Sequence, residues 1–275
     1  MSGKVHHIIY KVDELKPYIN WPYFDYAWGV GTRGRHERSE LRREAEAMLD
    51  QLEGRYSAHA LFGIFTANSD GDDILVGGVR IPMLRQQNAA GSRQHNLCLA
   101  DFVRPLSMGV PDEVGVFATT VDAALEKDFA TADPYRKMMA QTLADRLAEA
   151  AAEKMHQEVR TNYWGYAPDE RLTIQQLHIE AFQGIRPAVG YPSLPDTSVN
   201  FILSDLLDMK QIGIRLTESG MMMPHASVSG LMIAHPKARY FDLGKIGEDQ
   251  LRDYAARRGV PVELMRRFLS NSLIK

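Results

Sequence analysis

The segment from Pro134 to Arg160 places the strongest single constraint on the fold. It opens with Asp133 and Pro134, a good N-cap residue followed by a residue favoured in the first helical turn. Apolar side chains then recur at spacings of three and four residues, at Met139, Leu143, Leu147 and Ala150. The segment is therefore predicted to be the longest helix of the chain, with one buried face that the rest of the protein must cover.

Other helix-like and strand-like segments are interspersed along the chain in no regular order. A second amphipathic helix is predicted from His36 to about Leu52, and shorter helices over residues 173–180 and 198–209 and on both sides of Gly259. The runs that favour β-structure are HALFGIFTA and DDILVGGVRI around a turn at 68–71, then residues 95–103, 114–120, 214–217, 227–235 and 238–244. The first 35 residues, rich in aromatic side chains and glycine, are predicted to be irregular.

This order of segments favours one architecture. A parallel α/β fold would require a regular βαβ alternation, which the sequence lacks. The 275 residues contain no repeat, low-complexity tract or linker-like stretch. The chain is therefore predicted to be a single α+β domain, residues 1–275, with an antiparallel sheet and helices.

Composition and charge exclude several classes of protein. Hydrophobic residues make up 45% and charged residues 24%, as in folded soluble proteins rather than disordered or fibrous ones. The formal net charge of −3 offers no general attraction to nucleic acid or to an anionic membrane. Cys98 is the only cysteine, which excludes an intrachain disulfide and a thiolate-only metal site within the chain. No apolar run is long enough for a membrane span or a signal peptide, so we expect a cytoplasmic protein.

Four short motifs suggest sites, and each has a simpler structural interpretation. Gly29-x-Gly31-x-x-Gly34 matches the dinucleotide fingerprint, but the preceding YINWPYFDYAW is not the short aliphatic strand that the fingerprint requires. The terminal helices around Gly259 resemble an arginine-bearing helix-turn-helix, but the acidic chain favours a solvated helical hairpin. The histidines at 6–7 and the methionines at 221–223 could bind a metal. However, adjacent strand residues point apart, and methionine runs more often fill a core.

The best candidate site from the residues alone is a loop around Arg186. The segment QGIRPAVGYPSLPD contains Pro187, Pro192 and Pro195 with two glycines, so it cannot be a regular helix or a central strand. These residues would fix the backbone and leave the guanidinium of Arg186 positioned for bidentate recognition of a carboxylate. We therefore predict a binding loop over residues 186–192.

The loop RPAVGYP at 186–192 resembles the RPxxGYP loop of the activation domain of cobalamin-dependent methionine synthase. Further matching segments follow in the same order along the chain: YINW at 18–21, FTANSDGDDI at 65–74, NLCLADFV at 96–103, ADRLAEAAAEKMHQEVR and YWGYAPDE within 144–170, LTES at 216–219, ASVSG at 226–230 and HPKARYF at 235–241. The resemblance covers nearly the whole chain. It implies a C-shaped α+β domain, with a twisted antiparallel sheet flanked by helices, that binds S-adenosylmethionine in a shallow groove and closes over a cobalamin.

The resemblance also implies roles for individual residues of the loop and its surroundings. Arg186 would pair with the methionyl carboxylate of the ligand, and the loop backbone at Ala188 and Gly190 would meet its polar groups. Tyr240 would contact the ligand. Phe241 replaces a second tyrosine of the family and lacks its hydroxyl.

Three carboxylates and one tyrosine complete the implied site. Glu44 stands where the family usually has an aspartate and would contact the ligand amino group. Glu149 and Glu180 match carboxylates near the site that would complement the sulfonium and ammonium charges. Tyr191 would face the cobalamin partner and belong to the methyl-transfer face.

The activity that the resemblance implies is reductive methylation of cobalamin. A flavodoxin-type donor would supply one electron to inactive cob(II)alamin, and the sulfonium methyl of S-adenosylmethionine would pass to cobalt, restoring methylcobalamin. The chain has no Asp-x-His-x-x-Gly cobalamin motif, so a separate cobalamin-binding methionine synthase chain would carry this cofactor. Methyl transfer abstracts no proton, so neither a general base nor a metal site is expected.

Alternatives to this interpretation stay open from the sequence. A non-catalytic module could bind S-adenosylmethionine or dock on a corrinoid protein without transferring a methyl group. A nicotinamide oxidoreductase built on the Gly29 motif is a more distant alternative. The sequence also leaves open whether the chain is a split-gene product, an excised domain or a diverged homologue.

Overall fold

The computed structural model describes residues 3–30, 34–87 and 95–274. Its main sheet has the strand order β4-β3-β2-β5-β8, with β1 paired to β2, and every pair is antiparallel. The strands are β1 Val5–Lys11, β2 Ser57–Asp70, β3 Asp73–Val76, β4 Val79–Pro82, β5 Asp112–Val121 and β8 Ser227–Met232. A separate two-stranded ribbon is formed by β6 Arg215–Leu216 and β7 Met222–Met223.

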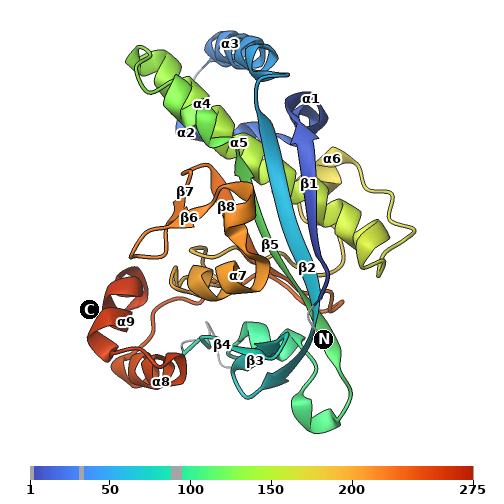
Figure 1. The fold of residues 1–275 in the computed structure, drawn as a ribbon, viewed down its shortest axis with the longest axis vertical. Coiled ribbons are helices and arrows are strands. Elements are labelled where there is room, and N and C mark those ends of the chain that lie inside the picture. Colours follow the sequence, from blue (N-terminus) through green and yellow to red (C-terminus); the bar gives the residue numbers. More distant parts are fainter. Residues whose placement is uncertain (1–2, 31–33, 88–94, 275) are drawn as a thin grey trace.

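Helices lie around this sheet (Figure 1). They are α1 Val12–Leu15, α2 Trp21–Ala27, α3 Arg35–Leu52, α4 Ala123–Asp128, α5 Pro134–Glu158, α6 Ile174–His178, α7 Val199–Leu207, α8 Glu248–Arg258 and α9 Val262–Phe268. Short 3-10 segments cover Lys16–Tyr18, Leu99–Phe102, Leu106–Met108, Met209–Ile212 and Ser270–Ser272. A π-helical turn, Val159–Tyr163, continues directly from α5.

Strand β2 organises the sheet because it pairs along both of its edges. One edge pairs with β5 from Ala58 to Ala67, while the other pairs with β1 over 57–63 and then with β3 over 67–70. The long strands β2 and β5 thereby connect a group of helices at one end, α2 to α5, with β3 and β4 at the other end, near α8 and α9 (Figure 1). The result is a curled antiparallel sheet flanked by helices (Figure 1).

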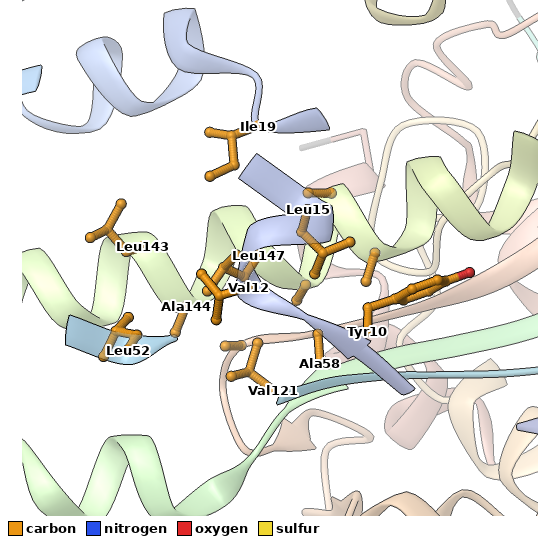
Figure 2. Packing of buried hydrophobic residues seen from close by; sticks show 14 of the residues in the cluster. Tyr10, Val12, Leu15, Ile19, Leu52, Ala58, Val121, Leu143, Ala144 and Leu147 are labelled. Carbon is orange, nitrogen blue, oxygen red and sulfur yellow. The ribbon is translucent and has the colours of Figure 1, made fainter. Parts of the chain in front are cut away.

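The sheet is buried on both faces. Because strand side chains alternate in direction, Ala60 and Phe62 of β2 pack with α3 and α5 in one hydrophobic cluster, whereas Leu61 and Phe65 pack with α7 in another. Figure 2 shows the first cluster, in which the stripe of α5 gathers with α1, β2 and β5, represented by Leu143, Ala144, Leu147, Val12, Leu15, Ala58 and Val121. Full burial of one such leucine is worth about 1.5–3 kcal/mol. Helix α5 is thus anchored firmly enough to hold functional side chains on its other face.

The α+β class and both long helices predicted from the sequence are confirmed. Helix α3 covers Arg35–Leu52 and α5 covers Pro134–Glu158. The predicted N-cap is also present, because the Asp133 carboxylate accepts a hydrogen bond from the backbone N–H of Arg136 at 3.0 Å. The predicted stripe of α5 is buried at all four of its positions.

Three local predictions are wrong, each for a physical reason. The first residues are not irregular, because 5–11 pair with β2 as an edge strand and two helices follow. Residues 95–103 contain a 3-10 turn instead of a strand, since the Asp101 carboxylate accepts a hydrogen bond from the Cys98 N–H. Residues 238–244 form no strand, because side chains bind their N–H groups: Phe241 donates to Ser193 Oγ and Gly244 to Asp242.

Candidate functional site

The loop at residues 185–191 is attached to the edge of the main sheet. Ile185 and Ile233 exchange two backbone hydrogen bonds of 2.9 Å, and Pro187 O accepts from the Leu231 N–H at 3.0 Å. The contact is so close at Gly230 that an added Cβ would lie 2.2 Å from the oxygen of Pro187. Only glycine fits there, so the sheet itself fixes the loop.

This loop forms one wall of a pocket of about 600 Å³. The opposite wall is the half-buried side of α5, and the remaining walls come from the segment after β1, the end of α6 and residues 240–242. The lining side chains are Tyr18, Asn20, Tyr23, Arg146, Glu149, Ala150, Glu153, Leu177, His178, Glu180, Arg186, Pro187, Ala188, Tyr191, Pro192, Ser193, Val228, Tyr240, Phe241 and Asp242. A volume of this size suits a ligand of several hundred daltons.

Both the backbone and the side chain of Arg186 are held by hydrogen bonds. Its backbone N–H donates to the hydroxyl oxygen of Tyr240 at 2.8 Å, and its Nη2 donates to the Glu153 carboxylate at 2.8 Å. The Arg186 and Glu153 side chains are only 12% and 13% exposed, and the Arg186 Nε and the Glu153 Oε1 are buried without a hydrogen-bond partner. Burial opposes the guanidinium charge, but nearby carboxylates, Glu153 foremost, outweigh burial and raise the pKa of Arg186.

Tyr240 keeps its proton under all ordinary conditions. Burial raises its pKa to about 12, although the positive charge of Arg186 acts in the opposite direction. The hydroxyl oxygen already accepts a hydrogen bond from the Arg186 backbone, so the hydroxyl hydrogen can be donated to a ligand. Tyr240 therefore offers a neutral donor next to a cation.

Glu180 places a carboxylate in the pocket from a strained backbone conformation. Helix α6 ends in a Schellman motif, with Glu180 N–H bonded to Leu177 O and Ala181 N–H bonded to Gln176 O. Glu180 is the left-handed residue of that motif, with φ +58°, where glycine is the usual choice. Burial, followed by the negative charge of Glu153, raises the pKa of Glu180, while Arg186 partly offsets both effects. A strained residue in a pocket points to a function.

Tyr191 and Glu149 form the outer part of the pocket. The Tyr191 hydroxyl donates to Glu149 Oε1 at 2.8 Å, and the tyrosine remains 53% exposed. Burial of the hydroxyl end, together with the Glu149 charge, raises the pKa of Tyr191. The ring thus stands at the mouth of the pocket, where a second molecule could reach it.

The structure brings together most of the residues that the sequence singled out. Seven of them line the pocket: Glu149, Glu180, Arg186, Ala188, Tyr191, Tyr240 and Phe241. Gly190 does not line it, and its N–H donates to Leu194 O at 2.8 Å, with φ +88°, so it shapes the loop. Glu44 does not line it either, because it lies on α3 and accepts a hydrogen bond from the Tyr135 hydroxyl.

Two pocket residues were missed that the sequence could have indicated. Asn20 lies in the matching YINW segment and lines the pocket where Glu44 does not. Glu153 follows Glu149 by four residues, which places both carboxylates on one face of α5. Helical spacing alone was thus sufficient to find Glu153.

The first glycine of the motif at 29–34, the terminal helices and the histidine pair take ordinary structural places in the fold. Helix α2, and not a strand, precedes Gly29, while Gly31 lies outside the described residues. Residues 248–268 form the helical hairpin of α8 and α9. His6 stacks on Phe62 and His7 contacts His59, so the two histidines point apart. Within residues 3–30, 34–87 and 95–274, no cluster of three or more His, Cys, Asp or Glu side chains is suited to a metal ion.

None of the helices in the described part of the chain is long and apolar enough to cross a membrane.

The chemistry of the pocket fits a zwitterionic ligand with an additional positive charge. Arg186 and Tyr240 provide donors for a carboxylate, and Glu149, Glu153 and Glu180 provide acceptors for cationic groups. Leu177 and Val228 add apolar surface. His178 also lines the pocket, but its Nε2 lies 3.1 Å from the carbonyl oxygen of Tyr18, and this hydrogen bond gives the ring a structural role. The site is built for binding and orientation more than for proton transfer.

Comparison with known proteins gives two consistent results. The profile of one protein family, described as vitamin B12 dependent methionine synthase, activation domain, matches residues 11–259. A solved structure described as the MetH reactivation domain bound to AdoHcy is 38% identical in sequence and aligns with a TM-score of 0.91. The alignment covers 99% of this chain and 91% of that chain.

Proposed function

This chain belongs to the vitamin B12 dependent methionine synthase activation domain family, and we propose that it binds S-adenosylmethionine in the pocket beside Arg186. The relative bound to AdoHcy supports this ligand, since AdoHcy is what remains of S-adenosylmethionine after its methyl group has left. One observation of this structure carries the proposal: Glu149, Glu153 and Glu180 line the same pocket as Arg186. That arrangement matches an α-amino acid attached to a sulfonium.

The residues present fit this ligand. The Arg186 Nε and the Glu153 Oε1 are buried without a partner, which is costly unless a ligand or water completes their hydrogen bonds. Arg186 would hold the carboxylate, with Tyr240 as a second donor. Glu149 and Glu180 would attract the ammonium and sulfonium charges, and the backbone at Ala188 would meet remaining polar groups.

We further propose that the bound ligand serves the reductive methylation of a cobalamin held by the cobalamin-binding part of a methionine synthase. In this reaction one electron from a flavodoxin-type donor would reduce the cobalamin substrate, the S–CH3 bond of the sulfonium would break as its methyl group passes to cobalt, and AdoHcy would be left in the pocket. The protein's own residues orient the ligand so that its methyl group faces the mouth of the pocket, where Tyr191 is exposed. Because the transfer moves no proton, the structural role of His178 is compatible with it.

The test is methyl transfer to a partner protein. We would incubate the chain with methyl-labelled S-adenosylmethionine, the cobalamin fragment of a methionine synthase and a reductant, and measure labelled methylcobalamin. Formation of methylcobalamin only when all components are present supports the proposal. Binding of the ligand by calorimetry without any turnover would instead support a module that binds S-adenosylmethionine without transferring methyl. Binding of NADH in its place would refute the ligand assignment.

Tyr191→Ala should slow methyl transfer more than it weakens ligand binding. The ring stands at the mouth of the pocket, so its loss should disturb the approach of the corrin more than the ligand beneath. We expect a single-turnover rate about tenfold or more below wild type, with ligand affinity within about threefold. Tyr191→Phe is the matched control, because it removes only the hydroxyl that binds Glu149. A Tyr191→Ala rate equal to wild type would exclude this role for the ring.

Ligand affinity should fall on acidification, beginning at a higher pH than for an ordinary glutamate. The raised pKa of Glu180 means that its carboxylate is protonated, and loses its attraction for a cation, before an exposed glutamate would be. Glu180→Gln should weaken binding at neutral pH and flatten this dependence. Glu263→Gln, at an exposed position in α9, should leave the titration curve unchanged. The measurement is ligand affinity by calorimetry between pH 4.5 and pH 8. Parallel curves of affinity against pH for wild type and Glu180→Gln would rule out Glu180 as the group that titrates.

The same substitution should slightly stabilise the unliganded protein at neutral pH. A carboxylate with a raised folded-state pKa adds stability when protonated, and that stability is lost as the pH rises through the folded-state pKa. Glu180→Gln removes a charge that the fold holds unfavourably. A higher Tm together with weaker ligand binding would identify Glu180 as a residue kept for its function.

A further inference from the structure

Among the three carboxylates of the pocket, Glu153 is the one that forms a hydrogen-bonded ion pair with Arg186. Its Oε2 accepts from Arg186 Nη2 at 2.8 Å, and the two side chains are almost equally buried. The hydrogen bonds within the described residues use only the backbone N–H and Nη2 of Arg186. The guanidinium also lies over the ring of Phe117, at 5.8 Å from the ring centre, and the hydrogen bond to Glu153 is the contact that orients it in the plane of the guanidinium.

The surroundings of Glu153 make this contact stable. Glu153 lies on α5, whose opposite face is anchored in the core. One turn further along is His156, which is fully buried, and neither of its ring nitrogens has a hydrogen-bond partner. Burial and the positive charges of Arg160 and Arg186 hold the pKa of His156 well below its ordinary value, so the ring is neutral. His156 thus offers Glu153 no competing cation, and Arg186 is the charge that Glu153 holds.

We propose that Glu153 is a positioning residue that fixes Arg186 for the ligand carboxylate and thereby selects ligands that carry one. This inference rests on the proposed function, because it concerns the same pocket. A free arginine side chain has many rotamers, and a carboxylate clamp requires one of them. Glu153 removes that freedom before the ligand binds, so the entropy cost of ordering the Arg186 side chain does not reduce the free energy of binding.

Glu153 also has an unfavourable effect on the binding of a carboxylate. Its negative charge repels a ligand carboxylate and competes with it for the guanidinium. However, Arg186 lies between the two anions, and its planar group can bind two carboxylates along different edges. Substitutions at Glu153 separate these effects. Glutamine keeps an oxygen that accepts from Nη2 without the charge, whereas alanine removes the contact altogether.

The experiment compares two ligands and four proteins. The ligands are S-adenosylmethionine and its decarboxylated form, which retains the sulfonium and amino group but has no carboxylate. The proteins are wild type, Glu153→Ala, Glu153→Gln and Glu158→Ala. Glu158 is a matched control on the same helix, because it is 26% exposed, pairs with Lys154 and does not line the pocket. Dissociation constants are measured by calorimetry, and folding is checked by thermal denaturation.

The expected pattern is specific to the ligand that carries a carboxylate. Glu153→Ala should weaken S-adenosylmethionine about tenfold, and Glu153→Gln should recover it to within about threefold of wild type. The decarboxylated ligand should bind all four proteins within about twofold, which also shows that the pocket of each variant is folded. Glu158→Ala should lose some thermal stability, because Tyr10 and Lys154 both bind the Glu158 carboxylate, but it should bind both ligands as wild type does.

Three results would overturn the inference. Unchanged affinity of Glu153→Ala for S-adenosylmethionine would show that Arg186 needs no support. Equal weakening of both ligands would show that Glu153 acts on the cationic part of the ligand or on the pocket as a whole. Equal loss in Glu153→Gln and Glu153→Ala would show that only the charge matters. Failure of wild type to bind either ligand would instead refute the proposed function, which is a distinguishable outcome.

Discussion

Arg186→Ala is expected to weaken S-adenosylmethionine binding by about 30- to 150-fold, corresponding to about 2–3 kcal/mol. A charge-assisted bidentate pair between guanidinium and carboxylate is lost, and no other arginine of the pocket lies in the fixed loop. Arg186→Lys should recover only part of the affinity, because a point charge cannot reproduce the planar fork. Calorimetry at a temperature well below the Tm of each variant gives the constants.

Two controls make this result interpretable. Arg239→Ala removes the same charge from an exposed residue next to Tyr240 that does not line the pocket, and it should bind normally. Decarboxylated S-adenosylmethionine is the second control, since it should bind this variant nearly as well as wild type. Apart from these controls, the Tm of Arg186→Ala should fall, because the substitution leaves the mostly buried Glu153 carboxylate without its cation. Equal affinity of Arg186→Ala and wild type for S-adenosylmethionine would remove Arg186 from the site.

Periodicity predicted the parts of the fold that depend on one buried face. The stripe Met139, Leu143, Leu147 and Ala150 is a strong signal because a long helix must place every third or fourth side chain in the core. Strand β1 gave no such signal, since an edge strand half exposed to water has a mixed pattern, and its burial varies along 5–11. Residues 238–244 are rich in strand-forming side chains, but local side-chain partners decided their conformation.

The candidate site could be predicted where its geometry is local. Proline and glycine content around Arg186 indicated a fixed loop, and the structure shows that the sheet edge completes the fixation through Gly230. The partnership of Arg186 with Glu153 is not local, because 33 residues separate them. The segment YINW, which contains Asn20, matched the family pattern, but its position beside α5 and the loop is visible only in the folded chain. Glu44 matched a pattern in sequence, but α3 carries it to Tyr135.

A buried ion pair lies next to the segment between Glu180 and Arg186. Arg160, in the π-helical turn after α5, makes two hydrogen bonds to the Glu170 carboxylate, at 2.8 Å and 2.7 Å. The Arg160 side chain is fully buried and that of Glu170 is 6% exposed. The Arg160 guanidinium also lies 4.1 Å from the ring of Phe182, in the segment between Glu180 and Arg186. The pair therefore connects the end of α5, through Phe182, with the segment between Glu180 and Arg186.

Glu170→Ala should destabilise the protein by about 3–5 kcal/mol, because it leaves a fully buried guanidinium without its counterion. The measurement is urea denaturation followed by circular dichroism, with Glu46→Ala as the control. Glu46 forms an exposed pair with Arg42 on α3, and its removal should cost about 0.5 kcal/mol or less. The double variant Arg160→Met/Glu170→Leu should be more stable than Glu170→Ala, because it replaces both charges with apolar side chains of similar volume. If Glu170→Ala proves no less stable than Glu46→Ala, water must reach Arg160 and the pair does not support the pocket. If the double variant is stable yet binds S-adenosylmethionine weakly, the ion pair acts on the Glu180–Arg186 segment through Phe182 as well as on stability.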